Sequence, residues 1–177
     1  MKRLLFFLLF IICVKLGWGE NTSFSNAIML NLRAGTIFGA GGVGFNFDQG
    51  FEYQFFLGNK LPWGFEINYH TVFGGWGFCV KTGPMFIING SGLSGVFFQT
   101  YFGFKGEMIT GLNWLGDFFV PILELDGIFA YQFANQGGFF ASFGAGPNLV
   151  IVLDAGPLGG GGVGIGVKGA IRVGYAF

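Results

Sequence analysis

The feature that most constrains the fold is a strict alternation of residue types near the C-terminus. Between Val163 and Phe177, one set of alternate positions carries the large apolar residues Val163, Ile165, Val167, Ile171, Val173, Tyr175 and Phe177. The opposite set carries Lys168 and Arg172 among glycines and alanines. Successive side chains of a β-strand point to opposite faces. This stretch therefore predicts a strand with one apolar face and one small, cationic face.

The same period of two recurs upstream, interrupted at intervals by glycine, asparagine and proline. Such punctuation is typical of many strands joined by short turns. Beyond residue 19, no stretch offers the roughly 18 uncharged apolar residues that a membrane-spanning helix needs. With the C-terminal stretch, the pattern predicts eight strands, the other seven covering residues 29–39, 50–58, 63–73, 77–88, 95–105, 118–133 and 138–154.

The charged residues of these strands decide which face points inward. None of them falls on the apolar set of alternate positions. Nine that fall on the polar set are called the interior charges: Arg33, Glu52, Glu66, Lys81, Lys105, Glu124, Asp126, Lys168 and Arg172. A lipocalin-like barrel would place the apolar face inside, but eight strands enclose too little space for so many phenylalanines. A membrane barrel places apolar side chains outside and polar ones inside, and closure removes the sheet edges that lipid does not tolerate. The predicted fold class is all-β: a single antiparallel up-and-down transmembrane β-barrel of eight strands, apolar outside and polar inside.

The first 19 residues have the organisation of a secretory signal peptide. Lys2 and Arg3 precede an apolar run, residues 4–14, that is too short to span a membrane, and Gly17 and Gly19 supply small residues for cleavage. We therefore expect a signal peptide over 1–19 and one barrel domain over 20–177. Without the leader, six of the nine basic residues remain against nine acidic ones, which excludes the basic surface of a nucleic-acid-binding protein.

The lengths of the connections predict the orientation of the barrel. The connections after the second, fourth and sixth strands are tight, whereas those after the first, fifth and seventh are longer: 40–49, 106–117 and 155–162. Outer-membrane barrels have short periplasmic turns and longer outer loops. Both termini are therefore expected in the periplasm. Pro84, Pro121 and Pro147 fall within predicted strands, where they predict bulges or strand ends.

The pattern resembles the small eight-stranded outer-membrane barrels of the OmpA/OmpX type. The final "VKGAIRVGYAF", with Ile171, Val173, Tyr175 and Phe177 at alternate positions, is similar to the C-terminal signal that the outer-membrane barrel assembly machinery recognises. The resemblance implies location in the cell outer membrane, contact with its lipid and assembly by that machinery. It implies no activity, and the chain departs from the family in its glycine content of 35 residues. We expect a monomer.

The interior charges are the candidate functional residues. Basic residues fall on the eighth and first strands and on the fourth and fifth, while acidic residues fall on the second and third and on the sixth. This order predicts ion pairs between neighbouring strands, with Glu124 and Asp126 paired to Lys105. The charges could form a plug of salt bridges or the charged constriction of a narrow pore.

No pattern indicates a catalytic, cofactor or metal site. His70 is the only histidine, and a hydrolase would need a serine or an acid beside it; Ser142 is predicted at the other end of the barrel. The segment 39–44 matches G-x-G-x-x-G, but a strand pattern follows it where a dinucleotide site needs a helix. We expect a structural or surface-interaction protein rather than an enzyme. The alternatives are a narrow pore or channel for small or apolar solutes and, third, an enzyme acting on outer-membrane lipid.

Overall fold

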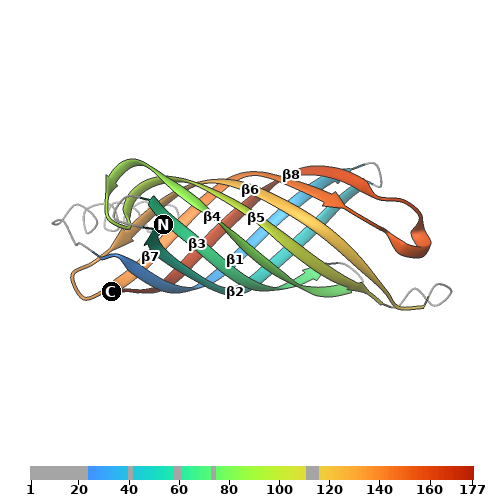
Figure 1. Ribbon diagram of the computed structural model, residues 1–177, viewed down its shortest axis with the longest axis horizontal. Coiled ribbons are helices and arrows are strands. Elements are labelled where there is room, and N and C mark those ends of the chain that lie inside the picture. Colours follow the sequence, from blue (N-terminus) through green and yellow to red (C-terminus); the bar gives the residue numbers. More distant parts are fainter. Residues whose placement is uncertain (1–23, 40–41, 58–60, 73–74, 111–115) are drawn as a thin grey trace, which may run out of the picture.

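Eight antiparallel strands form a closed barrel in the computed structural model, which describes residues 24–39, 42–57, 61–72, 75–110 and 116–177. Each strand pairs with its neighbours in chain order, and β1 pairs with β8 to close the cylinder (Figure 1). The predicted fold class is confirmed. The elements are β1 (Asn26–Gly39), β2 (Gly42–Leu57), β3 (Leu61–Val72), β4 (Gly75–Ser91), β5 (Ser94–Ile109), β6 (Phe118–Ala134), β7 (Phe139–Val152), a short 3-10 helix η1 (Gly156–Leu158) and β8 (Gly162–Ala176).

The predicted signal peptide, residues 1–19, lies outside the described residues. Within the part of the chain that the structure describes, no helix is long and apolar enough to cross a membrane.

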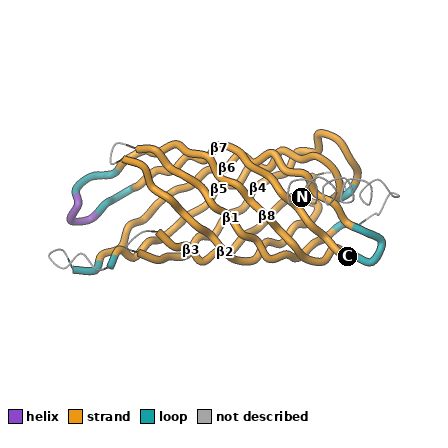
Figure 2. The backbone as a smooth tube through the Cα atoms, turned by 180° about the vertical axis from the view of Figure 1, so that it is seen from behind, coloured by secondary structure: helices purple, strands orange, loops and turns teal. Residues whose placement is uncertain are grey.

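The barrel has two different ends. Asn26 and Phe177 join backbone hydrogen bonds, with Asn26 N donating to Phe177 O at 3.0 Å. The start of β1 and the end of β8 therefore meet at one end, which we call the terminal end; the opposite end is the far end (Figure 1). The 3-10 helix η1 lies in the connection between β7 and β8, at the far end (Figure 2).

The prediction of a long connection over 40–49 is wrong. Strand β2 begins at Gly42, which pairs with Gly39 of β1, so the two strands form a tight hairpin. The reason is that the alternation continues upstream of residue 50: Phe45 and Phe47 are exposed, while Asn46 and Asp48 are buried. At the far end, the connections after β5 and β7 remain the longer ones, since β6 begins only at Phe118 and β8 at Gly162.

The prolines do not end strands. Pro84, Pro121 and Pro147 lie within β4, β6 and β7. The register of β6 with β7 is the same on both sides of Pro147, because Asp126 pairs with Asn148 and Phe129 with Ala145. The register shift between β4 and β5 lies at Ile87/Asn89, beyond Pro84. A proline removes one ladder donor, and the closed sheet tolerates that loss here without a bulge at the proline.

The outer wall of the barrel is apolar. Phe45, Phe51, Phe129 and Ile165 are 73%, 62%, 56% and 64% exposed, and most other large outward side chains are aliphatic or aromatic. The inward positions carry buried polar and charged side chains instead. The molecule therefore reverses the usual arrangement of a water-soluble protein, in which apolar side chains are buried and charged side chains are mostly exposed.

Candidate functional site: the barrel interior

The interior is divided into layers along the barrel axis. The strand registers place residues of similar chemistry at the same height, so that an apolar layer, two charged layers and a cavity follow one another from the terminal end to the far end.

An apolar layer closes the terminal end, and we call it the terminal plug. Leu93, in the turn between β4 and β5, is 1% exposed and packs into this layer together with Phe97 and Phe140. Phe24 and Phe56 pack against it. The full set of buried residues in the terminal plug is Ala27, Met29, Met85, Leu93, Phe97, Ala134, Phe140 and Ala176.

Above the terminal plug lies an arginine layer made by Arg33, Arg172, Glu52, Glu66 and Tyr101. Arg33 forms ion pairs with Glu66 and, at 3.9 Å, with Glu52; Arg172 forms an ion pair with Glu52. The Tyr101 hydroxyl donates to Glu52 at 2.6 Å, and the Arg33 guanidinium lies 5.0 Å from the centre of the Tyr101 ring. A carboxylate accepts several donors at once, which is what the burial of two arginines requires.

Next comes a lysine layer made by Lys81, Lys168, Asp48, Glu124 and Asp126. Lys81 contacts Asp126 at 2.7 Å and Glu124 at 2.9 Å. Lys168 contacts Asp48 at 2.9 Å and also pairs with Glu124. Arg33 reaches up to Asp126 at 2.8 Å and so joins the two charged layers.

The ion pairs differ from those predicted. Pairs between neighbouring strands were expected, but most of the pairs join strands that are not neighbours. Arg33 of β1 reaches Asp126 of β6, three strands away around the barrel, and Lys168 of β8 reaches Asp48 of β2, two strands away. The expected pairing of Lys105 with Glu124 and Asp126 is also wrong, because Lys105 binds Glu107 at 2.7 Å. An eight-stranded barrel is narrow enough for a long side chain to reach strands beyond its immediate neighbours.

All nine interior charges are 0–1% exposed. Removing charges from water costs several kcal/mol per ion unless each is paired and hydrogen-bonded. Each of the five basic residues among the interior charges has at least one acidic partner. The layers therefore form a continuous network rather than a set of separate pairs.

The sequence reasoning missed a histidine cluster on the far-end side of the lysine layer. His70 Nδ1 contacts Asp48, and His70 Nε2 lies 2.9 Å from Glu107. Both Asp48 and Glu107 lie in ranges that the sequence predicts as loops. Asp48 nevertheless falls on the same set of alternate positions as Asn46 and Glu52, and Glu107 falls on the same set as Lys105. Following the alternation past the predicted strand ends would have found both. The two carboxylates bind opposite ring nitrogens, and no group of three or more His, Cys, Asp or Glu side chains in the described ranges is arranged to hold a metal ion.

At the far end the interior opens into a cavity of about 520 Å³, which we call the far-end cup. Ile122 and Val150 are buried in its wall, and Ile37 packs against them from β1. Asn46, Lys105 and Glu107 supply its polar atoms. The cup is therefore mainly apolar, with polar groups on the side of the charged layers.

The predicted assembly residues lie on the outer wall. Ile171, Val173 and Tyr175 are 61%, 46% and 53% exposed on β8, the strand that closes the barrel against β1, and Phe177, directly after β8, is 54% exposed. Tyr175 and Phe177 stack with their ring centroids 6.5 Å apart.

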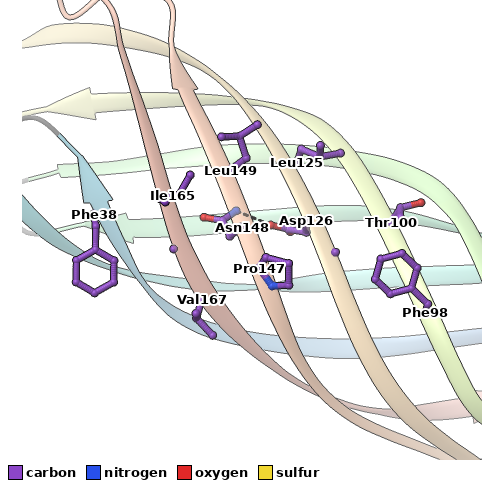
Figure 3. Close-up of a pocket in the computed structure, with 12 residues that line it drawn as sticks. Phe38, Phe98, Thr100, Leu125, Asp126, Pro147, Asn148, Leu149, Ile165 and Val167 are labelled. Atoms are coloured by element: carbon purple, nitrogen blue, oxygen red, sulfur yellow. Dashed lines mark hydrogen bonds between the residues drawn. The ribbon is translucent and has the colours of Figure 1, made fainter.

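The outer wall also carries a shallow groove of about 550 Å³ across β5 to β8 (Figure 3). Small or compact residues, Thr100, Gly127 and Pro147, lie there between larger neighbours such as Phe98 and Leu125. Asp126 and Asn148, hydrogen-bonded to each other, belong to the interior beneath this groove (Figure 3). The Thr100 hydroxyl in this groove donates to the Pro84 carbonyl oxygen at 3.2 Å, so it is already hydrogen-bonded within the sheet.

Comparisons with known proteins support the fold. No family model and no curated protein matches the sequence. Among solved structures, the crystal structure of Neisserial surface protein A (NspA) is similar, with a TM-score of 0.61 and 9% identity over 85% of this chain and 97% of that chain. At this identity the likeness concerns the fold alone, and it agrees with the small eight-stranded barrel type that the sequence resembles.

Proposed function

We propose that this chain is an integral outer-membrane barrel that does not conduct and that has a structural or surface-interaction role. The observation that carries the proposal is the filled interior, in which the terminal plug and two charged layers lie in series. A pore would need a continuous aqueous path, and buried side chains occupy the axis here.

The outer wall supports a location in lipid. Strands of 12 to 17 residues exceed the about 9–11 residues that a tilted strand needs to cross a bilayer. Large apolar side chains such as Phe51, Ile67 and Phe102 are 50% or more exposed. In water such a surface would aggregate, whereas hydrocarbon solvates it.

The asymmetry of the connections supports an orientation with both termini in the periplasm, as short periplasmic turns and longer outer loops are typical of these barrels. The exposed apolar face of β8 supports recognition by the barrel assembly machinery. We further propose a monomer, since closure leaves no sheet edge to pair with a second copy.

The interior offers little to catalysis. Both nitrogens of His70 contact carboxylates, so neither is left to activate a hydroxyl nucleophile. The surface-interaction role is consistent with the name of the structural neighbour, a surface protein.

The test is electrical recording after reconstitution. The purified chain should require detergent, insert into planar bilayers and produce no discrete conductance steps, while a porin in the same bilayers produces them. Regular steps from this chain would favour the narrow pore instead. A folded monomer that dissolves in buffer without detergent would contradict the membrane location itself.

A further inference from the structure

We propose that the far-end cup binds a small uncharged amphiphile, a molecule with an apolar body and one hydroxyl, carbonyl or amide group. Binding needs only the folded barrel. The further statement that the cup collects its ligand from outside the cell rests on the proposed function, because the orientation decides which side the far end faces.

The walls of the cup are suited to an apolar body. Ile122 and Val150 are 3% and 5% exposed, and Ile37 and Val152 pack against them. On another part of the wall the inward positions are glycines: a Cβ at Gly44 would have its nearest contact, the Ile37 carbonyl oxygen, 4.0 Å away. The missing side chains are what leave the space open.

The polar end of the cup contains an amide without a partner. Asn46 is 5% exposed, and among the described residues neither its side-chain nitrogen nor its side-chain oxygen has a hydrogen-bond partner. A buried amide without partners costs free energy that a ligand hydrogen bond would recover. Asn46 can both donate and accept, so a hydroxyl, carbonyl or amide group satisfies it.

The charges beside Asn46 argue for a neutral ligand. Lys105 and Glu107 pair with each other at 2.7 Å, and Glu107 also contacts His70 at 2.9 Å. An ionised ligand would lose its hydration in an apolar cup without gaining a free counter-charge. The volume of about 520 Å³ lies in the range of roughly 300–1,000 Å³ that is usual for small-molecule sites.

The experiment is a titration of the methyl-labelled barrel in lipid nanodiscs with 1-hexanol, followed by NMR. The inward methyl groups of Val150 and Ile122 should shift and saturate. The outward methyl groups of Val80 and Leu125, which are 44% and 45% exposed, should report only unsaturable partition into lipid. Hexanoate, of similar length but ionised, should bind at least tenfold more weakly.

Two variants and one control locate the site. Gly44→Phe fills the cup where space is open and should abolish saturation, whereas Val80→Phe on the outer wall should leave it unchanged. Asn46→Leu keeps the volume but removes the hydrogen bond and should weaken binding about tenfold. Each variant is compared only after its spectrum shows a folded barrel.

The outcomes separate this proposal from the proposed function. A barrel that enters nanodiscs but whose Val150 and Ile122 signals never saturate overturns the binding site and leaves the membrane role intact. Equal binding of hexanoate and 1-hexanol overturns the assignment of a neutral ligand. A chain that does not enter lipid overturns the proposed function, on which the access of the cup from outside the cell depends.

Discussion

The two ends of the interior are both lined by inward-facing residues of the barrel strands, yet one end is closed and the other is open. At the terminal end these positions carry Met29, Phe97 and Phe140, which are 0–2% exposed. At the far end, Gly44 of β2 and Gly162 of β8 line the cavity, and an added Cβ would have no neighbour closer than 4.0 Å at Gly44 and none within 4 Å at Gly162. The β-branched side chains line only part of the wall.

The difference teaches that side-chain volume, rather than strand number, decides where such a barrel is sealed. An eight-stranded barrel has an interior that side chains can just fill. Large residues at one end fill it, and glycines at the other leave a cavity. The charged layers between them join non-adjacent strands by ion pairs inside the barrel.

The largest expected effect separates the two ends directly. Phe140→Ala in the terminal plug should lower the free energy of unfolding by about 3–5 kcal/mol, because it leaves a cavity among packed neighbours. Val150→Ala borders existing space and should cost only about 1–2 kcal/mol. Urea unfolding in lipid vesicles measures both. A cost of about 3 kcal/mol or more for Val150→Ala would mean that the far end is as tightly packed as the terminal end, because the loss of two methyl groups alone accounts for about 1–2 kcal/mol.

The next prediction concerns the charged layers that separate the ends. Asp126→Leu leaves Arg33 and Lys81 without their shared partner and should cost about 3–5 kcal/mol. The matched control is Asp117→Asn, an exposed acid outside the network, which should stay within about 0.5 kcal/mol of the parent. A small effect of Asp126→Leu in the same unfolding assay would show that the network is not the link between non-adjacent strands.

On the outer wall, adding a charge should be destabilising, whereas in the interior the removal of a charge is. Phe102 is 56% exposed, and Phe102→Arg should cost about 2–4 kcal/mol if this position lies near the bilayer midplane. Phe102→Leu keeps an apolar side chain and serves as the control. The comparison is made in vesicles, and tolerance of arginine there would place Phe102 in water.

The smallest effect tests the packing of the arginine layer. A Cβ at Gly64 would lie 2.3 Å from the Tyr101 hydroxyl and 2.6 Å from the nearest ring carbon. Gly64→Val should therefore cost about 1–3 kcal/mol through overpacking. Adding Tyr101→Leu should recover part of that loss, because the two positions are in contact and their effects are not additive. Strictly additive costs would show that Tyr101 does not occupy this space.

Much of the fold was predictable because alternation is a local property of the sequence. The positions of Lys168 and Arg172 against Val167 and Ile171 distinguish the two faces of β8 without any tertiary information. The number of strands and the closed all-β fold followed from repeating that reasoning. The β1–β2 hairpin was missed because glycines at 39–44 resemble a loop, although the alternation through Phe45 and Phe47 continues the strand.

The arrangement of the interior was less predictable from the sequence. The partners of Lys81 and Lys168 depend on which non-adjacent strands approach each other inside the barrel, and that geometry is set by barrel closure rather than by neighbours in the sequence. The far-end cup is a cavity, and no single residue in the sequence predicts a cavity. The histidine cluster could be predicted from the alternation of residue types if β2 and β5 were given their full lengths.

The central claim is that apolar side chains face hydrocarbon while the charged layers are enclosed. It is tested most directly by methyl NMR of the unaltered chain in nanodiscs that contain a lipid with a spin label deep in its acyl chain. The account predicts that the signals of outward Ile67, Leu125 and Val167 are broadened and that those of inward Ile128 and Met29 are spared. Broadening of the inward methyl groups to the same extent, or of neither set, would contradict it.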